Sequence, residues 1–403
     1  MRRLYFYKGI VLTMMHFKNC VFVLLLSMLC VSDVYANTIF SFHGLGNSVR
    51  RIDARSRAMG GAGRSLVDGF NFSTNNPALL AGFRKPSMSA QFISQRRDIS
   101  GLGSINDGDL GGFHIVVPFH NGTVFGVGVD PITDMDFAAT DTVGSGDLGY
   151  QMALDASGGI QAISFGLAQH FGQKFYAGVR VDVIALGTFN ELWAKSFFGQ
   201  NIFFSSDNIT RTHRGWIPAI GMVYTPSAKW SVGGNVQIGR DIRQRTILTT
   251  RFVSVNADSD IETKKQVKLP SLVGGGVTYL AGYRWLAALD VERGLWRKTE
   301  AGRFNTWDLS AGVLIRTGNP DLLSRSRRWE LNAGLHYRSL YFPTASGQQI
   351  GEVGASFGLA IPFKNQSGRF RYVLEVGSRG NQTDHGVSEK YIQQSFSVSG
   401  IFH

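Results

Sequence analysis

From Phe83 to the end of the chain, apolar and polar residues alternate with a period of two. In FYAGVRVDV, residues 175–183, one face carries Phe, Ala and three Val, and the other carries Tyr, Gly, Arg and Asp. Residues 307–316 and 329–337 repeat this arrangement. Because successive side chains of a strand point to opposite faces of a sheet, each of these segments is predicted to be a β-strand.

The number and length of these segments predict how the strands are arranged. About fourteen segments can be counted, and many exceed about ten residues, which suits a strand that crosses a membrane at a tilt. The apolar face often ends in an aromatic residue and the other face is small or charged, as an interfacial girdle and a hydrated lumen require. We therefore predict an all-β fold, a transmembrane antiparallel β-barrel of about fourteen strands in the bacterial outer membrane. The segments begin near residues 83, 110, 122, 157, 173, 208, 228, 264, 283, 303, 328, 349, 368 and 388.

The connections between the segments fall into two classes. FHNG, FGQK, TPSAK and LAGY are short turns, whereas residues 94–110, 138–156 and 256–265 are longer and polar. Outer-membrane barrels have short periplasmic turns and long outer loops, so the alternation predicts that both termini are periplasmic. Residues 317–328 form a long loop on the side where short turns are expected. The last strand alternates up to Phe402, a pattern that the barrel-assembly machinery reads, and this machinery is a predicted partner.

The first 36 residues have the order of a secretory signal peptide. Basic residues precede the apolar run VFVLLLSMLCV, residues 21–31, and the cleavage-site sequence VYA ends at Ala36. Both cysteines, Cys20 and Cys30, lie in this segment, so the exported chain has neither a disulfide nor a thiolate metal site. The formal net charge of +12 makes anionic outer-membrane lipid or lipopolysaccharide a predicted partner, while export argues against nucleic acid.

Between the signal peptide and the strands, residues 37–82 are rich in Gly, Ser and Asn. A barrel of this size encloses a lumen that its own side chains do not fill. We therefore predict three parts: the signal peptide 1–36, a lumenal plug or hatch 37–82, and the transmembrane barrel 83–403. Hatch arginines are predicted to pair with acids of the wall: Arg50, Arg51, Arg55 and Arg57 with residues such as Asp182, Asp290, Asp308, Glu330 or Glu375.

Residues 40–82 resemble the N-terminal hatch of the FadL-type outer-membrane transport proteins. The matching residues are Gly44-Leu45-Gly46, the glycines Gly60, Gly61 and Gly63, and Asn76-Pro77-Ala78, which is similar to the Asn-Pro-Ala motif of that hatch. The resemblance implies transport of hydrophobic small molecules, such as long-chain fatty acids or aromatic hydrocarbons, across the outer membrane. The same fold and hatch occur in PorV- and PorQ-like barrels. Protein secretion or surface attachment, with secretion-system components as partners, is therefore the alternative.

Two further sites are predicted along a transport path. In the third strand, Pro131 lacks the N–H of a regular ladder, so Asp130 and Pro131 form a candidate lateral gate, which the FadL-type resemblance also implies. The alternative is that this strand has already reached the outer rim at Pro131. An aromatic cluster in a predicted outer loop is either a ligand-capture surface or part of an interfacial belt. Its members are Phe197, Phe198, Phe203 and Phe204.

No convincing catalytic constellation is found in the sequence. There is no H-E-x-x-H zinc helix, and the nine histidines are dispersed. His114, His170 and His336 fall on the polar faces of strands, where hydration in the lumen explains them better than a metal ion does. We predict a protein that is not an enzyme and has no cofactor and no metal site. Barrel enzymes with a Ser–His pair exist, so a lipase or protease is the remaining alternative.

Overall fold

The computed structural model describes residues 44–101, 103–144, 149–197, 204–252, 257–317, 329–344, 347–363 and 367–402. All of these residues belong to one compact unit, Ala36–His403. The predicted signal peptide, residues 1–36, lies outside the described residues. Within the part of the chain that the structure describes, no helix is long and apolar enough to cross a membrane.

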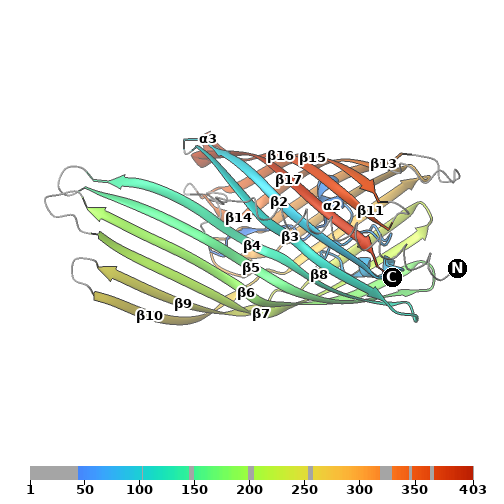
Figure 1. Ribbon diagram of the computed structural model, residues 1–403, viewed down its shortest axis with the longest axis horizontal. Helices are drawn as coiled ribbons and strands as arrows, with labels where there is room; N and C mark the ends of the chain where they lie inside the picture. The colour runs from blue at the N-terminus through green and yellow to red at the C-terminus, as the bar shows by residue number, and fades with distance from the viewer. Residues whose placement is uncertain are drawn as a thin grey trace, which may run out of the picture. The chain divides into compact units, whose positions relative to one another are not determined.

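The wall of the molecule is one antiparallel sheet that closes on itself (Figure 1). Its segments are β2 (Ser87–Ile99), β3 (Gly103–Pro118), β4 (Thr123–Val143), β5 (Tyr150–Phe171), β6 (Phe175–Phe197), β7 (Phe204–Ser227), β8 (Trp230–Gln237), β9 (Asp241–Phe252), β10 (Ala257–Lys268), β11 (Leu272–Ala281), β12 (Trp285–Gly294), β13 (Thr306–Arg316), β14 (Glu330–Pro343), β15 (Gln349–Pro362), β16 (Gly368–Asn381) and β17 (Val387–Ile401). β8 and β9 are two halves of one strand along β7, and β10 and β11 are the halves of the next strand. Pairing of β17 with β2 closes the wall, which confirms the predicted barrel of 14 strands.

The outer face of the barrel is apolar between two levels of aromatic residues. On β7, Trp216, Ile220, Met222 and Tyr224 are each about half exposed, while Val223 between them is fully buried. Exposed aromatic side chains at both ends of an apolar stretch are the girdles of a lipid-facing band. The chain is therefore a barrel of the bacterial outer membrane, as predicted.

The predicted long outer loops are mostly strand. β2 reaches Ile99 before β3 resumes at Gly103, β4 runs to Val143, and β10 begins at Ala257. Polar composition does not distinguish a loop from a strand outside the membrane. The hydrogen bonds of a ladder join backbone groups, so a strand can continue through residues with polar, exposed side chains. β5, β6 and β7 have 22, 23 and 24 residues, about twice the length that crosses a membrane. Together with β4, β9 and β10 they extend well past the other strands at one end (Figure 1).

Inside the barrel, residues 44–82 carry three short elements: β1 (Asn47–Ser48), α2 (Ala54–Ala58) and η2 (Pro77–Gly82). Asp53 begins α2, because its side chain accepts a hydrogen bond from the N–H of Ser56. Asn76 caps η2, and Pro77 follows at the first helical position, where no N–H is needed. α2 contacts β14–β17 and η2 contacts β4–β7, so these residues reach two separate parts of the wall. Between strands lie η4 (Trp296–Lys298) and α3 (Gln382–His385).

Candidate functional site

The side chain of Asn76 makes three hydrogen bonds, one of them to the inner wall. Asn76 is fully buried. Its Oδ1 accepts from the N–H of Ala78 at 3.1 Å, and its Nδ2 donates to the carbonyl of Arg64 at 2.8 Å and to that of Met222, on β7, at 3.3 Å. One side chain thus joins η2, the segment before it and the wall.

Changing Asn76 to Ala is expected to weaken the attachment of the hatch, residues 44–82, by about 2–3 kcal/mol, since a cap and two further hydrogen bonds are lost from a buried site. Amide hydrogen exchange of residues 64–82 measures this loss, with rates expected to rise by about 30-fold or more. Asn121→Ala is the matched control, because Asn121 caps only the exposed turn at Thr123. Equal exchange rates in the Asn76 variant and in the wild type would contradict the prediction.

Glycines of the wall allow the hatch backbone to come close. A methyl group at Gly221 would lie 2.0 Å from Asn76 Oδ1, and one at Gly178 would lie 2.5 Å from the carbonyl oxygen of Pro77. At the other contact, a methyl group at Gly334 would lie 2.1 Å from the N atom of Gly60. These inward-facing glycines were not predicted as site residues. The sequence does contain a signal for such contacts. A glycine that the period-two pattern places on the lumenal face of a strand marks a position where another backbone can come close.

The predicted hatch glycines lie at the end of α2. Gly60, Gly61 and Gly63 have φ values of +70°, +107° and +140°, which favour glycine. The N–H of Gly60 donates to Ser356 Oγ at 2.9 Å, and that of Gly63 donates to Asp290 Oδ2 at 3.0 Å. The structure therefore places the predicted residues 60–63 and 76–78 in one lumenal segment that contacts two parts of the wall.

Asp130 of the candidate gate faces the lumen rather than lipid, and it is 3 % exposed. Its carboxylate accepts hydrogen bonds from Arg51 at 3.2 Å, from Thr74 Oγ1 at 2.9 Å and from His114 Nε2 at 2.9 Å. Arg51 also binds Asp182 of β6 at 2.5 Å. Both wall carboxylates are thereby tied to the hatch through one guanidinium group, a geometry with strong charge-assisted hydrogen bonds.

Other hatch arginines follow the predicted pattern in part. Arg50 and Arg57 lie 3.0 and 3.8 Å from Glu375 of the wall, as expected. Burial lowers the pKa of Arg57 to about 10, against the attraction of Glu375, so this side chain stays charged at neutral pH. Arg55 pairs at 2.5 Å with Asp68 of the hatch itself, which was not predicted, and it also interacts electrostatically with Glu330, one of the predicted wall acids.

Arg64 also pairs with the wall, although it was not among the arginines predicted to do so. Arg64 lies 2.9 Å from Glu292 and 4.0 Å from Asp290, both on β12. It adds a third attachment between the hatch and the wall.

The ladder between β3 and β4 is incomplete. These strands pair only from Phe113–Pro118 to Val124–Val129, although β4 continues past Pro131 to Val143. Within the described residues, β3 residues 103–112 pair with β2 alone. β4 itself therefore continues past Pro131, and the alternative that Pro131 lies at the outer rim of the bilayer stays a prediction. A bulge directly after Pro131 shifts the register of β4 against β5. Proline favours such a bulge because it has no N–H to donate to the ladder.

The hatch occupies part of the free edge of β4. Asn47 and Ser48 of β1 pair with Asp134 and Thr133, which lie just beyond the bulge. The edge that β3 leaves unpaired is thus covered from inside by a short strand rather than by the wall.

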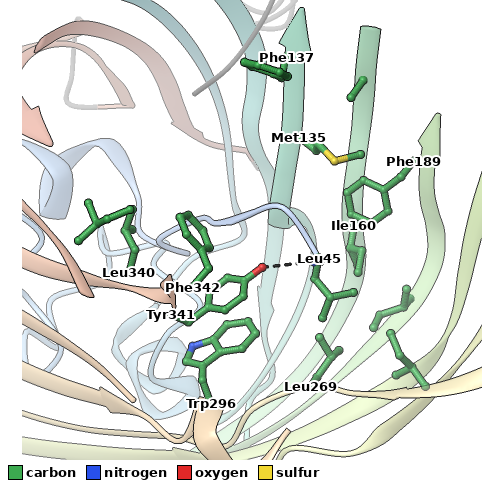
Figure 2. Packing of buried hydrophobic residues seen from close by; sticks show 14 of the residues in the cluster. Leu45, Met135, Phe137, Ile160, Phe189, Leu269, Trp296, Leu340, Tyr341 and Phe342 are labelled. Atoms are coloured by element: carbon green, nitrogen blue, oxygen red, sulfur yellow. Dashed lines mark hydrogen bonds between the residues drawn. The ribbon is translucent and has the colours of Figure 1, made fainter. Parts of the chain in front are cut away.

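Buried apolar side chains cluster in the lumen beside the part of β4 that does not pair with β3 (Figure 2). Trp296 stacks on Tyr341 at a centroid distance of 3.8 Å, and the Tyr341 hydroxyl donates to Gly46 O at 2.6 Å and accepts from Leu45 N at 3.2 Å. Met135 brings the cluster to the unpaired part of β4. We call this set the lumenal apolar cluster; its buried members are Leu45, Met135, Phe137, Leu154, Ala156, Ile160, Ile184, Phe189, Ile217, Ile242, Leu269, Trp296, Leu340, Tyr341, Phe342 and Ile350.

The expectation of a hydrated lumen lined by small or charged residues is wrong at this level. Val129 and Met135 of β4 have the same parity and should share a face in an unbroken strand. The bulge after Pro131 adds one residue, which turns Met135 and Phe137 into the lumen. A one-residue insertion of this kind leaves no mark on the period-two pattern of the sequence.

A small cavity of about 90 Å³ lies where the hatch, the wall and the apolar cluster meet. Its lining includes Trp296, Leu340 and Tyr341 on one side and Arg50 and Arg51 on the other. An apolar cavity of about 150 Å³ holds benzene. A hydrocarbon would therefore fit here only after neighbouring side chains move.

The predicted capture residues cannot be placed as a group. Phe198 and Phe203 lie outside the described residues. Phe197 ends β6 and Phe204 begins β7, and the structure describes their backbone alone. The capture surface stays a prediction.

One predicted lumenal histidine lies in an internal network of charged side chains. His336 is buried rather than hydrated, and its Nε2 lies 3.1 Å from the Tyr391 hydroxyl and 3.3 Å from Glu352. His336, Glu352 and Glu375 are close enough to share a cation, but Arg379 at 2.5 Å and Arg50 at 3.0 Å already balance the two carboxylates. The arrangement is that of an internal ion-pair network.

Comparison of the sequence with families gives a decisive match. The family model described as BamG matches residues 14–400. The chain belongs to the BamG family. None of the curated proteins compared with this BamG-family chain is a significant match.

Several solved structures share the fold of this BamG-family protein. A Pseudomonas aeruginosa FadL homologue has a TM-score of 0.60 at 12% identity, covering 89% of this chain and 100% of its own. The CymD monoaromatic hydrocarbon channel has a TM-score of 0.57 at 16% identity, with coverages of 87% and 98%. The Pseudomonas putida toluene transporter TodX has a TM-score of 0.56 at 14% identity, with coverages of 89% and 100%. At such identities these likenesses establish the FadL-type fold.

Proposed function

We propose that this BamG-family barrel carries hydrophobic small molecules across the outer membrane and releases them sideways, between β3 and β4. The observation that carries the proposal is the contact of the lumenal apolar cluster with the unpaired part of β4 at Met135. In this proposal residues 37–82 are the hatch, residues 83–403 are the transport barrel, and the bulge after Pro131 keeps the exit open.

Physical chemistry favours a sideways exit for such cargo. Removal of apolar surface from water is worth about 25 cal/mol per Å². A hydrophobic molecule that leaves the apolar cluster through the wall enters the bilayer without crossing water. The hatch blocks the straight path, because its arginines bind wall carboxylates at Asp182 and Glu375.

The comparisons support this class of cargo. The solved structures that share the fold include a monoaromatic hydrocarbon channel and a toluene transporter, and these neighbours are transport channels rather than enzymes. A role without catalysis agrees with the contacts of buried His336, whose Nε2 lies 3.1 Å from the Tyr391 hydroxyl. The secretion or surface-attachment role gains no support from the comparisons.

A reversible cross-link across the opening tests the proposal. The carboxylates of Asp109 on β3 and Asp134 on β4 lie within 4.8 Å of each other. Asp109→Cys with Asp134→Cys, oxidised or joined by a short dithiol reagent, should tie the two strands together. We expect uptake of a radiolabelled long-chain fatty acid or of toluene by whole cells to fall at least about tenfold, and to recover on reduction.

The control places the same bond where the wall is already paired. Asp98 and Ser104 are cross-strand partners of β2 and β3, so Asp98→Cys with Ser104→Cys leaves the opening unchanged. Full uptake by the cross-linked Asp109/Asp134 variant, with the bond verified by mass spectrometry, would refute the lateral exit. Uptake that does not depend on the protein at all would refute transport itself.

A second candidate function follows from the family match alone. The BamG family name points to the barrel-assembly machinery, and the match spans residues 14–400. In this role the barrel would act beside that machinery. Depletion of the protein would then lower the amount of other folded outer-membrane barrels in cells grown without any hydrophobic substrate, whereas a transporter would leave their amount unchanged.

A further inference from the structure

Five exposed cations gather on the outer face of three neighbouring strands. Arg214 of β7, Arg243 and Arg245 of β9, and Lys264 and Lys268 of β10 share this face, as the register of the strands shows. We call them the β7–β10 basic surface. All of these cations except Lys268 line an open hollow of about 670 Å³.

The basic surface brings two pairs of like charges into directly opposed positions, although Asp241 faces Lys268 on the same side. Arg214 lies directly opposite Arg243, and Arg245 lies directly opposite Lys264. Like charges in directly opposed positions destabilise a sheet. Glu262 relieves the second pair, with distances of 2.7 Å to Arg245 and 3.0 Å to Lys264. Among the described residues, no carboxylate makes an ion pair with Arg214 or Arg243.

The height of the surface on the barrel fits the headgroups of the outer leaflet. Tyr224 and Trp216 mark the two girdles of β7, and the nine residues that they span match the length that crosses a membrane. Arg214 lies two residues beyond Trp216, on the same face and towards the long end of the barrel. Arg240 stacks on the Trp216 ring at 3.8 Å, which places a further cation at this level.

We propose that the β7–β10 basic surface binds the phosphate groups of lipid A, the membrane anchor of lipopolysaccharide. A phosphate between Arg214 and Arg243 would remove the repulsion of the opposed pair, and the planar guanidinium groups suit its oxygens. The acyl chains of the same lipid would lie along the apolar band below Trp216. The net charge of the sequence predicted an anionic lipid as a partner without locating its binding site. The β7–β10 basic surface is the site that we propose for it. The inference does not depend on the proposed transport function.

Binding of defined lipids to the full-length barrel in detergent tests the proposal. The probes are bis-phosphorylated lipid A and the same lipid without phosphates, added to protein stripped of lipid and detected by native mass spectrometry. Arg214→Gln with Arg243→Gln is expected to weaken binding of the phosphorylated lipid by about 10- to 30-fold. Wild-type protein should bind the dephosphorylated lipid no better than this double variant does.

Lys174→Gln with Lys229→Gln is the matched control, since both lysines are exposed in the short turns at the other end of the strands. It should bind phosphorylated lipid A as the wild type does. Thermal unfolding gives a second measurement that separates binding from misfolding. In lipid-free detergent the Arg214/Arg243 variant should be at least as stable as the wild type, because the repulsion is gone. On addition of phosphorylated lipid A, only the wild type and the control should gain stability.

Two outcomes would overturn the proposal. One is equal binding of phosphorylated lipid A by the wild type and the double variant. The other is a variant that retains lipid A but loses a co-purified acidic protein, which would make the basic surface a protein-docking site.

Discussion

Replacing Arg51 with Met is expected to detach the middle of the hatch from the wall. The change removes one cation from two buried carboxylates, Asp182 at 2.5 Å and Asp130 at 3.2 Å, and leaves Ser164 Oγ without its 2.6 Å contact to Arg51. Removing one partner of a buried ion pair costs about 3–5 kcal/mol. Arg180 still pairs with Asp182 at 2.9 Å and His114 still contacts Asp130 at 2.9 Å, so the lower end of this range is expected. Amide hydrogen exchange of residues 47–58 should therefore speed up by at least about 100-fold.

A displaced hatch has a functional readout as well. The lumen below the apolar cluster would admit water, so cells with the Arg51 variant should become sensitive to large antibiotics that the intact barrel excludes. Arg84→Met is the matched control, because Arg84 is exposed and makes no ion pair among the described residues. A normal exchange rate in a folded Arg51→Met barrel would show that the hatch is held without this guanidinium.

The barrel could be predicted from the sequence because the alternation of lipid-facing and lumen-facing side chains can be recognised within each strand by itself. A lipid-facing side chain must be apolar and its neighbour must face the lumen, so every spanning segment carries the period-two pattern. The predicted starts near residues 349, 368 and 388 agree with β15, β16 and β17 to within one residue. Strand ends outside the membrane were missed at Ile99 and Val143, since beyond the bilayer nothing forces one face to be apolar.

The ion pairs of the hatch were predictable in kind but not in partner. A buried arginine needs a counter-charge, and this rule identified Arg50, Arg51 and Arg57 as wall contacts. It does not choose between an acid of the wall and one nearby in sequence, which is why Arg55 with Asp68 was missed.

The incomplete pairing of β3 with β4 was predictable in position but not in extent. Pro131 marked its position, because a residue without an N–H cannot donate to a ladder. Its extent depends on two strands failing to meet from Asp130 onwards, and a pattern in one strand carries no information about that. The apolar cluster was hidden for a related reason, because the bulge reverses the face to which Met135 and Phe137 point.

Replacing Gly334 with Ala is expected to push α2 and the residues after it away from β14. The new methyl carbon would lie 2.1 Å from the N atom of Gly60 and 2.1 Å from the carbonyl carbon of Met59, and both are backbone atoms that cannot turn aside. Overpacking by one methyl group costs about 1–3 kcal/mol where side chains can adjust, so the upper part of this range is expected here. Exchange of residues 54–63 should rise by about 30-fold or more, while η2 keeps its contacts with β4–β7.

The matched control for Gly334 is Gly275→Ala on β11. The nearest atom to a methyl group there is 3.8 Å away. The control therefore makes the same substitution in a strand but causes no close contact with the hatch. Both variants should migrate as folded barrels in heat-modifiability gels, which separates hatch release from failed assembly. If Gly334→Ala exchanges as slowly as Gly275→Ala, the hatch backbone does not lie against β14, and the wall glycines have another role. If exchange rises across residues 44–82 as a whole, the two wall contacts form one cooperative unit, and release at α2 also frees the edge of β4 that β1 covers.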